Sequence, residues 1–171
     1  RHFDGLMHYP IRDALFDIID QKISATDFAD KVEGWLMRYP RENVIAMLVL
    51  LGSHDTKRLY RKMEGDWSKI KLASLFPFVY PGAPCVYYGD EIGMDGGSDP
   101  DCRRTFPWDE EQWNDDMRHW IQQLIRIRHE RVSLRRGELQ RIAVNEHGYA
   151  FCRNHEGEFT LVVMNFGDTR S

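Results

Sequence analysis

The sequence has few cysteines, no basic excess and no long apolar run. Its three cysteines, Cys85, Cys102 and Cys152, are odd in number and lack metal-site spacing, which argues against a disulfide framework and favours a reducing, cytoplasmic location. The formal net charge of −4 offers no positive surface for nucleic acid or an anionic membrane. The longest apolar stretch, residues 44–51, is far shorter than the roughly 20 residues of a membrane-spanning helix.

Several common catalytic motifs are missing as well. The seven histidines include no pair four residues apart with a glutamate between them, which argues against a zinc protease site. No Gly-Xaa-Ser-Xaa-Gly elbow occurs, and adjacent residues such as Ser53, His54 and Asp55 cannot form a hydrolase triad with good geometry. The glycine-containing residues 95–101 are acidic and would repel phosphate. Nucleophilic serine and phosphate chemistry are therefore disfavoured.

What the chain does contain is a high proportion of aromatic and apolar residues. Hydrophobic residues make up 42% of the chain, and five Trp, seven Tyr and nine Phe are present. This composition is typical of a globular protein with a substantial core, and aromatic faces also line clefts that bind rings.

Helical periodicity and turn residues divide the first part of the chain. Apolar residues recur three and four positions apart in four segments, each bounded by capping residues or proline. The predicted helices cover residues 11–19, residues 26–39 with Thr26 as N-cap, residues 69–78 and residues 114–131. Basic residues near the end of the last helix are explained by the helix dipole and solvent; they are Arg126, Arg128, His129 and Arg131.

Two kinds of strand are indicated. Residues 44–52 and 85–89 are apolar on both faces, as in parallel strands covered on both sides. After Gly137 the pattern changes to strands joined by short turns, typical of an antiparallel sheet; they are residues 139–144, 149–153 and 159–166. We therefore predict an α/β portion over residues 1–136 and a second, all-β module over residues 137–171.

Acidic residues follow both predicted parallel strands. His54 and Asp55 come after the first strand, and Asp90 and Glu91 come after the second. The carboxyl ends of parallel strands meet at one edge of a sheet, where ligands bind. Asp55 as a cap of the next helix is an equally open interpretation. Carboxylates acting on a neutral polar substrate favour glycoside hydrolysis, whose transition state carries developing positive charge.

A long polar loop follows the second of these strands, over residues 90–112. Loops of this length are usually functional or disordered. The aromatic residues Phe106 and Trp108 and an arginine pair indicate that it packs. Its stretch from Asp99 to Arg104 adds charged groups to the candidate site.

Three stretches resemble the α-amylase family of glycoside hydrolases. "NVIAMLVLLGSHDT" is similar to its strand-seven motif, and "PGAPCVYYGDEIGMDGGSDPDCRRTFPWD" to its strand-eight region and following loop. "FDGLMHYPIRDAL" resembles the strand-six start, with His8 where the family commonly has Asn. The likeness covers nearly the whole chain and is nearest to the neopullulanase, cyclomaltodextrinase and maltogenic amylase subgroup.

The resemblance implies a fold, an activity and site residues. The fold is a partial (β/α)8 TIM barrel, about strands six to eight, followed by the start of a β-sandwich domain. The activity is retaining hydrolysis of α-1,4-glucosidic bonds in maltooligosaccharides, cyclodextrins or related α-glucans. Asp55 resembles the third catalytic carboxylate, His54 a residue that binds the sugar at the cleavage site, and Asp99 and Arg103 binding groups for the adjacent glucose. Asp90 and Glu91 are interpreted as structural.

The resemblance also leaves parts of the family pattern unmatched. The nucleophile and the acid/base belong to motifs at strands four and five that have no counterpart here, so we expect a fragment that is inactive alone. The resemblance allows a calcium site, although no set of ligands can be assigned to one, and it implies no other cofactor. Open barrel edges predict self-association.

Three functional alternatives remain open. They are an α-glucanotransferase, a sucrose- or trehalose-type isomerase on the same fold, and a non-enzymatic amylase-like binding or assembly protein. The presence of both His54 and Asp55 disfavours the last of these.

Overall fold

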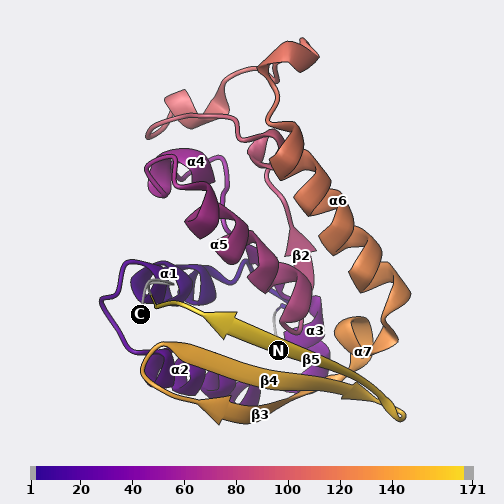
Figure 1. The fold of residues 1–171 in the computed structure, drawn as a ribbon. Coiled ribbons are helices and arrows are strands. Elements are labelled where there is room, and N and C mark those ends of the chain that lie inside the picture. Colours follow the sequence, from indigo (N-terminus) through magenta and orange to yellow (C-terminus); the bar gives the residue numbers. More distant parts are fainter. Residues whose placement is uncertain (1–2, 168–171) are drawn as a thin grey trace.

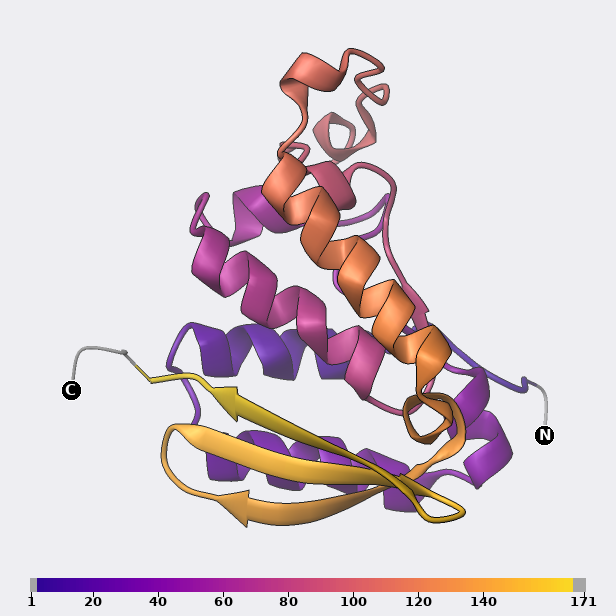
Figure 2. The same cartoon turned by 45° about the vertical axis from the view of Figure 1, so that its right-hand side comes forward.

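A computed structural model of the protein describes residues 3–167, in which helices and short parallel strands precede an antiparallel sheet (Figure 1). Helices α5 and α6 pack against each other, and α2 packs against the C-terminal sheet (Figures 1 and 2). The α-helices are α1 (Tyr9–Ile19), α2 (Ala25–Arg38), α3 (Arg41–Ala46), α4 (Leu59–Lys62), α5 (Trp67–Val79), α6 (Asp115–Glu130) and α7 (Val132–Arg136). The strands are β1 (Leu48–Leu50), β2 (Ala83–Cys85), β3 (Glu138–Val144), β4 (Gly148–His155) and β5 (Glu158–Asn165).

Helix α2 starts two residues earlier than the sequence predicts. The Oγ atom of Ser24 accepts a hydrogen bond of 3.1 Å from the Asp27 amide, and the Asp27 carboxylate accepts one of 3.2 Å from the Ser24 amide. This reciprocal capping box satisfies two amides that a helix start leaves unpaired. Thr26 lies inside the helix, and its hydroxyl donates to the carbonyl of Asn145 instead. The N-cap assigned to Thr26 is therefore wrong, whereas the end at Tyr39 is confirmed.

Both predicted parallel strands are shorter than their apolar runs. The segment taken as one strand over residues 44–52 is divided between α3 and β1, and the second strand is β2 rather than residues 85–89. Helix α3 starts directly after Pro40, which occupies its N-cap position without a capping side chain. The parallel pairing itself is confirmed, with Leu48 opposite Ala83 and Leu50 opposite Cys85. Met7 forms a further parallel bridge to Leu48.

One hydrophobic core joins the helices to the C-terminal sheet. The fully buried ring of Phe28 on α2 meets the rings of Phe76, Tyr149 and Phe166 edge-on, at centroid distances of 5.2, 6.2 and 5.6 Å. Helix and sheet residues belong to the same buried cluster. The boundary between the α/β portion and the all-β module, placed between residues 136 and 137, remains a prediction, because the hydrophobic core continues across it.

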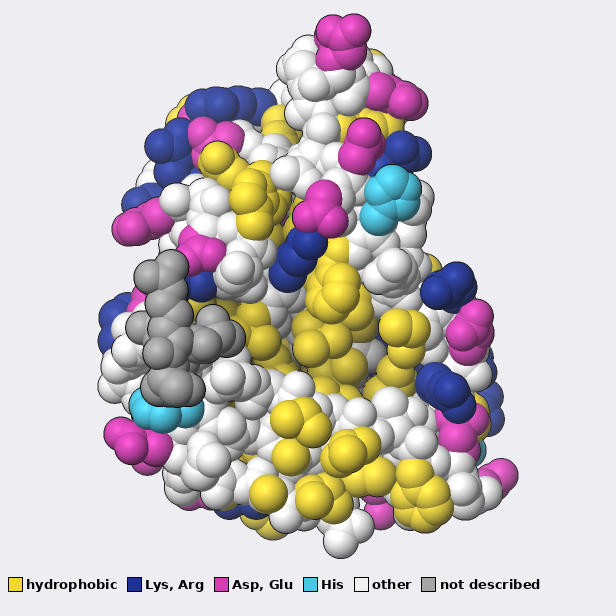
Figure 3. Space-filling view, viewed as in Figure 1, with side chains coloured by type: hydrophobic (Ala, Val, Ile, Leu, Met, Phe, Trp, Pro, Cys, Tyr) yellow, Lys and Arg dark blue, Asp and Glu magenta, His cyan; other side chains and the backbone are white. Residues whose placement is uncertain are grey.

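The antiparallel sheet has one buried and one exposed face. Strands β3, β4 and β5 pair in that order, and Phe151 on the inner face lies opposite Val162. On the outer face, Phe159, Leu161 and Val163 of β5 are each more than 60% exposed. Apolar side chains gather on this lower part of the surface in Figure 3. The three strands are confirmed, with small shifts at their ends.

Helix α6 agrees with its prediction except at one arginine. Asn114 caps it by accepting from the Met117 amide at 2.8 Å. Arg128, expected in solvent, is only 8% exposed and donates hydrogen bonds of 2.6 Å to the carbonyls of Phe78 and Gly82. These carbonyls lie at the end of α5 and just before β2, and local periodicity could not show that a tertiary neighbour would present them.

The loop after β2 is ordered by three 3-10 helices, η1 (Asp90–Ile92), η2 (Asp101–Arg103) and η3 (Glu110–Gln112). The expectation that its aromatic residues pack holds only in part. Phe106 is partly buried and meets Trp113 edge-on at 5.7 Å, but Trp108 is 84% exposed.

Among residues 3–167, no helix has the length and apolar character needed to cross a membrane.

Candidate active site

A tight turn directly after β1 carries His54 and Asp55. The Ser53 amide donates to the Thr56 hydroxyl at 3.0 Å, and the Asp55 amide donates to the Ser53 hydroxyl at 3.2 Å. Serine and threonine hydroxyls commonly hold turns in this way. Because the turn satisfies its own amides, the side chains of His54 and Asp55 stay free to face outward, at 59% and 60% exposure.

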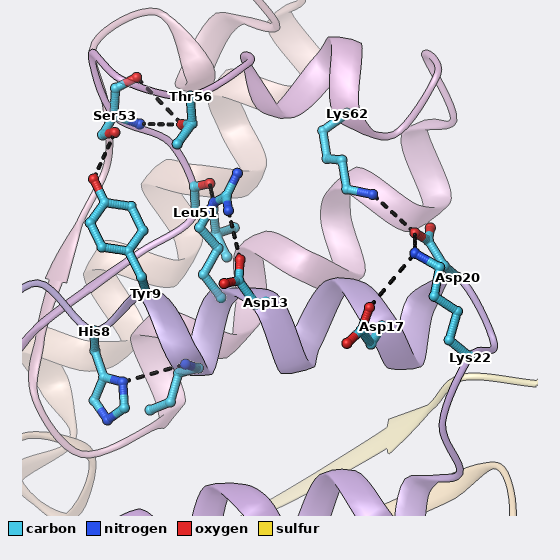
Figure 4. Close-up of polar contacts among 12 residues, drawn as sticks. His8, Tyr9, Asp13, Asp17, Asp20, Lys22, Leu51, Ser53, Thr56 and Lys62 are labelled. Atoms are coloured by element: carbon cyan, nitrogen blue, oxygen red, sulfur yellow. Dashed lines mark hydrogen bonds and ion pairs between the residues drawn. The ribbon is translucent and has the colours of Figure 1, made fainter.

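Helix α1 anchors this turn from the side. The Tyr9 hydroxyl lies 3.0 Å from Ser53 Oγ, and Arg12 Nε donates a hydrogen bond of 2.7 Å to the Leu51 carbonyl (Figure 4). His8 starts the same helix, its Nδ1 accepting from the Ile11 amide at 3.4 Å. An asparagine there could supply a similar acceptor, so His8 keeps the capping function. Burial lowers the pKa of His8, which favours the neutral ring that capping needs.

The loop after β2 reaches across to the His54–Asp55 turn. Arg103 Nε donates to the His54 carbonyl at 2.9 Å and lies 2.8 Å from Asp99 Oδ1, while Arg103 Nη2 lies 3.6 Å from Asp55 Oδ1. Cys102 Sγ lies 3.1 Å from the same His54 carbonyl. The four residues singled out from the sequence, His54, Asp55, Asp99 and Arg103, are thus brought into one cluster.

This cluster is open to solvent and mixes donors with acceptors. His54 Nε2 lies 3.3 Å from Asp55 Oδ1, and all four side chains are between 46% and 60% exposed. Ion pairs at such exposure contribute little to fold stability, about 0–1 kcal/mol. Carboxylate, imidazole and guanidinium groups at this spacing can instead accept from and donate to the hydroxyls of a neutral polar ligand.

Asp55 does not cap the following helix. The N-cap position of α4 is occupied by Arg58, and no side chain makes a capping hydrogen bond there. The Asp55 carboxylate has contacts with His54 and Arg103 instead. The structural interpretation of Asp55 that was open from the sequence is therefore wrong.

Arg58, which the sequence analysis missed, lies beneath the cluster. Its side chain is fully buried, and Nε donates to the Cys102 carbonyl at 2.9 Å while Nη1 donates to the Tyr88 carbonyl. Its backbone amide donates to Gly96 at 3.0 Å. Arg58 thus ties the segment after β1 to three points of the chain after β2: Tyr88, Gly96 and Cys102. No sequence signal distinguished this arginine, because its partners are all distant along the chain.

Asp90 is buried next to Arg58. Its Oδ1 lies 3.5 Å from Arg58 Nη1, and burial raises the pKa of Asp90 to about 7, although the positive charge of Arg58 opposes the shift. Gly52 leaves room for it, because a Cβ at Gly52 would lie 2.6 Å from Asp90 Oδ2. The buried Asp90 carboxyl group therefore packs against Arg58 and Gly52, which follow β1. Its neighbour in the sequence, Glu91, is partly buried.

The described residues, 3–167, contain no group of three or more His, Cys, Asp or Glu side chains arranged to hold a metal ion.

Comparison with known proteins identifies the family. Residues 1–137 match the family described as alpha amylase, catalytic domain, and the chain therefore belongs to this family of TIM-barrel enzymes. The cyclomaltodextrinase of Geobacillus thermopakistaniensis strain MAS1 is 39% identical over 166 residues, covering 95% of this chain and 28% of that protein. Neopullulanase 2 of Thermoactinomyces vulgaris is 37% identical, with the same coverage of each.

Solved structures show the same relationship. The cyclic α-maltosyl-(1→6)-maltose hydrolase of Arthrobacter globiformis, in complex with that sugar, superposes with a TM-score of 0.90 at 34% identity, over 94% of this chain and 37% of the other. A cyclomaltodextrinase structure superposes with a TM-score of 0.90 at 41% identity, over 95% and 28%. The chain spans less than a third of the length of the curated cyclomaltodextrinases and the neopullulanase that it matches.

Proposed function

We propose that this chain supplies the sugar-binding side of the active site of a retaining hydrolase of α-1,4-glucosidic bonds. Its substrates would be cyclodextrins, maltooligosaccharides or related α-glucans. The observation that carries the proposal is the meeting of the Asp55 carboxylate with His54 and Arg103 at the ends of β1 and β2. Relatives named cyclomaltodextrinase and neopullulanase, and a sugar-bound hydrolase of the same fold, support the substrate class.

Each residue has a proposed part in the reaction. Asp55 accepts hydrogen bonds from sugar hydroxyls, and its negative charge favours the oxocarbenium-like transition state. His54 donates to a hydroxyl of the same glucose. Arg103 orients the Asp55 turn through the His54 carbonyl and, with Asp99, contacts the neighbouring glucose unit. The barrel correspondence, with β1 and β2 as strands seven and eight, belongs to this proposal.

Hydrolysis with retention also needs a nucleophile and an acid/base whose carboxyl groups are about 5–5.5 Å apart. The family motifs that carry these groups have no counterpart in the 171 residues. We therefore expect the chain alone to cleave neither β-cyclodextrin nor pullulan. Cleavage by the purified chain that disappears in Asp55→Asn would contradict this.

A chimera tests the activity itself. These residues replace the matching segment of the Geobacillus cyclomaltodextrinase, which is 39% identical and keeps its own remaining catalytic groups. We expect the chimera to hydrolyse β-cyclodextrin and Asp55→Asn to reduce kcat at least about 100-fold with little change in unfolding temperature, because Asp55 is exposed. Unchanged activity in the variant would refute the assignment.

Product analysis separates the alternatives. With added maltose as acceptor, a hydrolase releases mainly free maltooligosaccharides, a glucanotransferase forms longer chains, and an isomerase acting on sucrose or trehalose gives a rearranged disaccharide. A folded chimera that binds maltotriose and converts none of these sugars would favour a binding protein.

A further inference from the structure

A second concave site lies away from the Asp55 cluster, between α3, α7 and the sheet strands β3 and β4. It is a cavity of about 250 Å³. Val44 and Pro81, which line it, precede β1 and β2, whereas Asp55 follows β1, so the cavity lies toward the opposite ends of these strands. Its charged lining residues are Arg41, Arg135, Arg136, Arg153 and Glu138.

The cavity concentrates positive charge in a protein whose net charge is −4. Four arginines line it, against the single carboxylate of Glu138. Within residues 3–167, none of the four has a carboxylate oxygen within 4.0 Å. Glu158, whose pKa Arg135 helps to lower, accepts its hydrogen bond from the Ser133 amide. By contrast, Arg141 on the same sheet forms ion pairs with both Asp30 and Glu33.

One of the four arginines, Arg153, carries its positive charge in the protein interior. Its side chain is 1% exposed, Nη1 and Nη2 donate to the Val79 and Gly137 carbonyls, and Nε has no acceptor. Burial, followed by repulsion from Arg128 and Arg41, lowers the pKa of Arg153 to about 9. A buried cation without a counter-ion is unfavourable. An anion in the adjacent cavity would add negative charge where the single carboxylate of Glu138 faces four arginines.

We propose that this cavity binds a phosphate group, either as inorganic phosphate or as the phosphate monoester of a small sugar. Planar guanidinium groups bind phosphate oxygens through paired, charge-assisted hydrogen bonds. A volume of about 250 Å³ accommodates a phosphate together with a small attached group. The apolar wall of Leu36, Ile45 and Leu139 faces such a group. The inference goes beyond the glucan activity and does not depend on it.

Calorimetric titration of the purified protein tests the site. The probes are inorganic phosphate, glucose 1-phosphate and citrate, at one pH and constant ionic strength so that screening does not change. The variants are Arg135→Gln and Arg136→Gln, whose side chains are exposed and should not be needed for folding. Arg126→Gln on α6 is the matched control, since it removes the same charge from an exposed position outside the cavity.

We expect saturable binding of both phosphate compounds, about tenfold weaker in each cavity variant and unchanged in Arg126→Gln, because each lost guanidinium removes a charge-assisted contact. Equal affinities would assign recognition to the phosphate alone, and tighter binding of the ester would assign a role to the apolar wall. The proposal is overturned if phosphate does not saturate, if the control loses as much affinity as the cavity variants, or if citrate binds more tightly than both phosphates.

Discussion

Arg103 holds the backbone of His54: its Nε donates a 2.9 Å hydrogen bond to the His54 carbonyl, 49 residues earlier in the chain. The same guanidinium faces Asp55 at 3.6 Å. One side chain from the loop after β2 therefore sets the position of the turn that presents the proposed catalytic carboxylate. The two halves of the site are coupled through this contact.

Arg103→Lys is expected to weaken maltotriose binding by the chimera about tenfold. Lysine keeps the charge but lacks the guanidinium's several directed donors, so it cannot contact His54, Asp55 and Asp99 together. Arg104→Lys is the matched control, because Arg104 pairs with Asp101 and has no contact with Asp55. Calorimetry measures both, and equal losses in the two variants would contradict the assignment.

Tyr9→Phe is expected to lower the free energy of unfolding of the purified protein by about 0.5–1.5 kcal/mol. It removes the 3.0 Å contact between the Tyr9 hydroxyl and Ser53 Oγ while keeping the ring. Tyr39→Phe serves as control, since Tyr39 is 40% exposed and lies at the end of α2. Urea denaturation compares them; a Tyr9→Phe protein as stable as the control would show that this contact adds nothing.

The buried Arg58–Asp90 pair calls for a double-mutant comparison. Arg58→Met should cost about 3–5 kcal/mol, because it removes the donor to the Cys102 and Tyr88 carbonyls as well as the counter-ion of Asp90. Adding Asp90→Asn should recover part of that loss, since the unpaired charge is removed. Urea denaturation gives the three free energies, and a double variant less stable than Arg58→Met alone would contradict the charge argument.

His8 should make stability fall in mild acid. Its pKa is lowered by burial in the folded state, so the unfolded chain binds the proton more readily. The His8 contribution is fully present above the unfolded pKa near 6.5 and declines as pH falls below it. In His8→Asn, which keeps a capping acceptor, the loss of unfolding free energy between pH 7.5 and 5 should be smaller. His119→Asn, at an exposed position on α6, is the matched control.

Self-association through open barrel edges stays a prediction, and the exposed outer face of β5 offers a second surface for it. Phe159, Leu161 and Val163 form an apolar row there, at 64%, 63% and 67% exposure. Leu161→Lys should shift sedimentation velocity profiles toward monomer, whereas Gln123→Lys, at an exposed position on α6 away from the sheet, should not. A wild-type protein that remains monomeric at high concentration would contradict this expectation.

Elements whose patterns are local could be predicted from the residues alone. Helices α1, α5 and α6 follow from repeated apolar spacing, and the turns around β4 follow from their glycines and asparagines. His54 and Asp55 were found because they follow an apolar run, and the resemblance to a family added Asp99 and Arg103.

Contacts between distant segments set where apolar runs change from helix to strand and which charged residues are buried. The run containing α3 and β1 has no distinguishing period, so long-range pairing with β2 sets its boundaries. The burial of Arg58, Arg128 and Arg153 depends on carbonyl groups contributed by distant segments. A local sequence pattern shows which face of an element avoids water. The hydrogen-bond partners of a buried polar group, in contrast, come together only when separate elements pack.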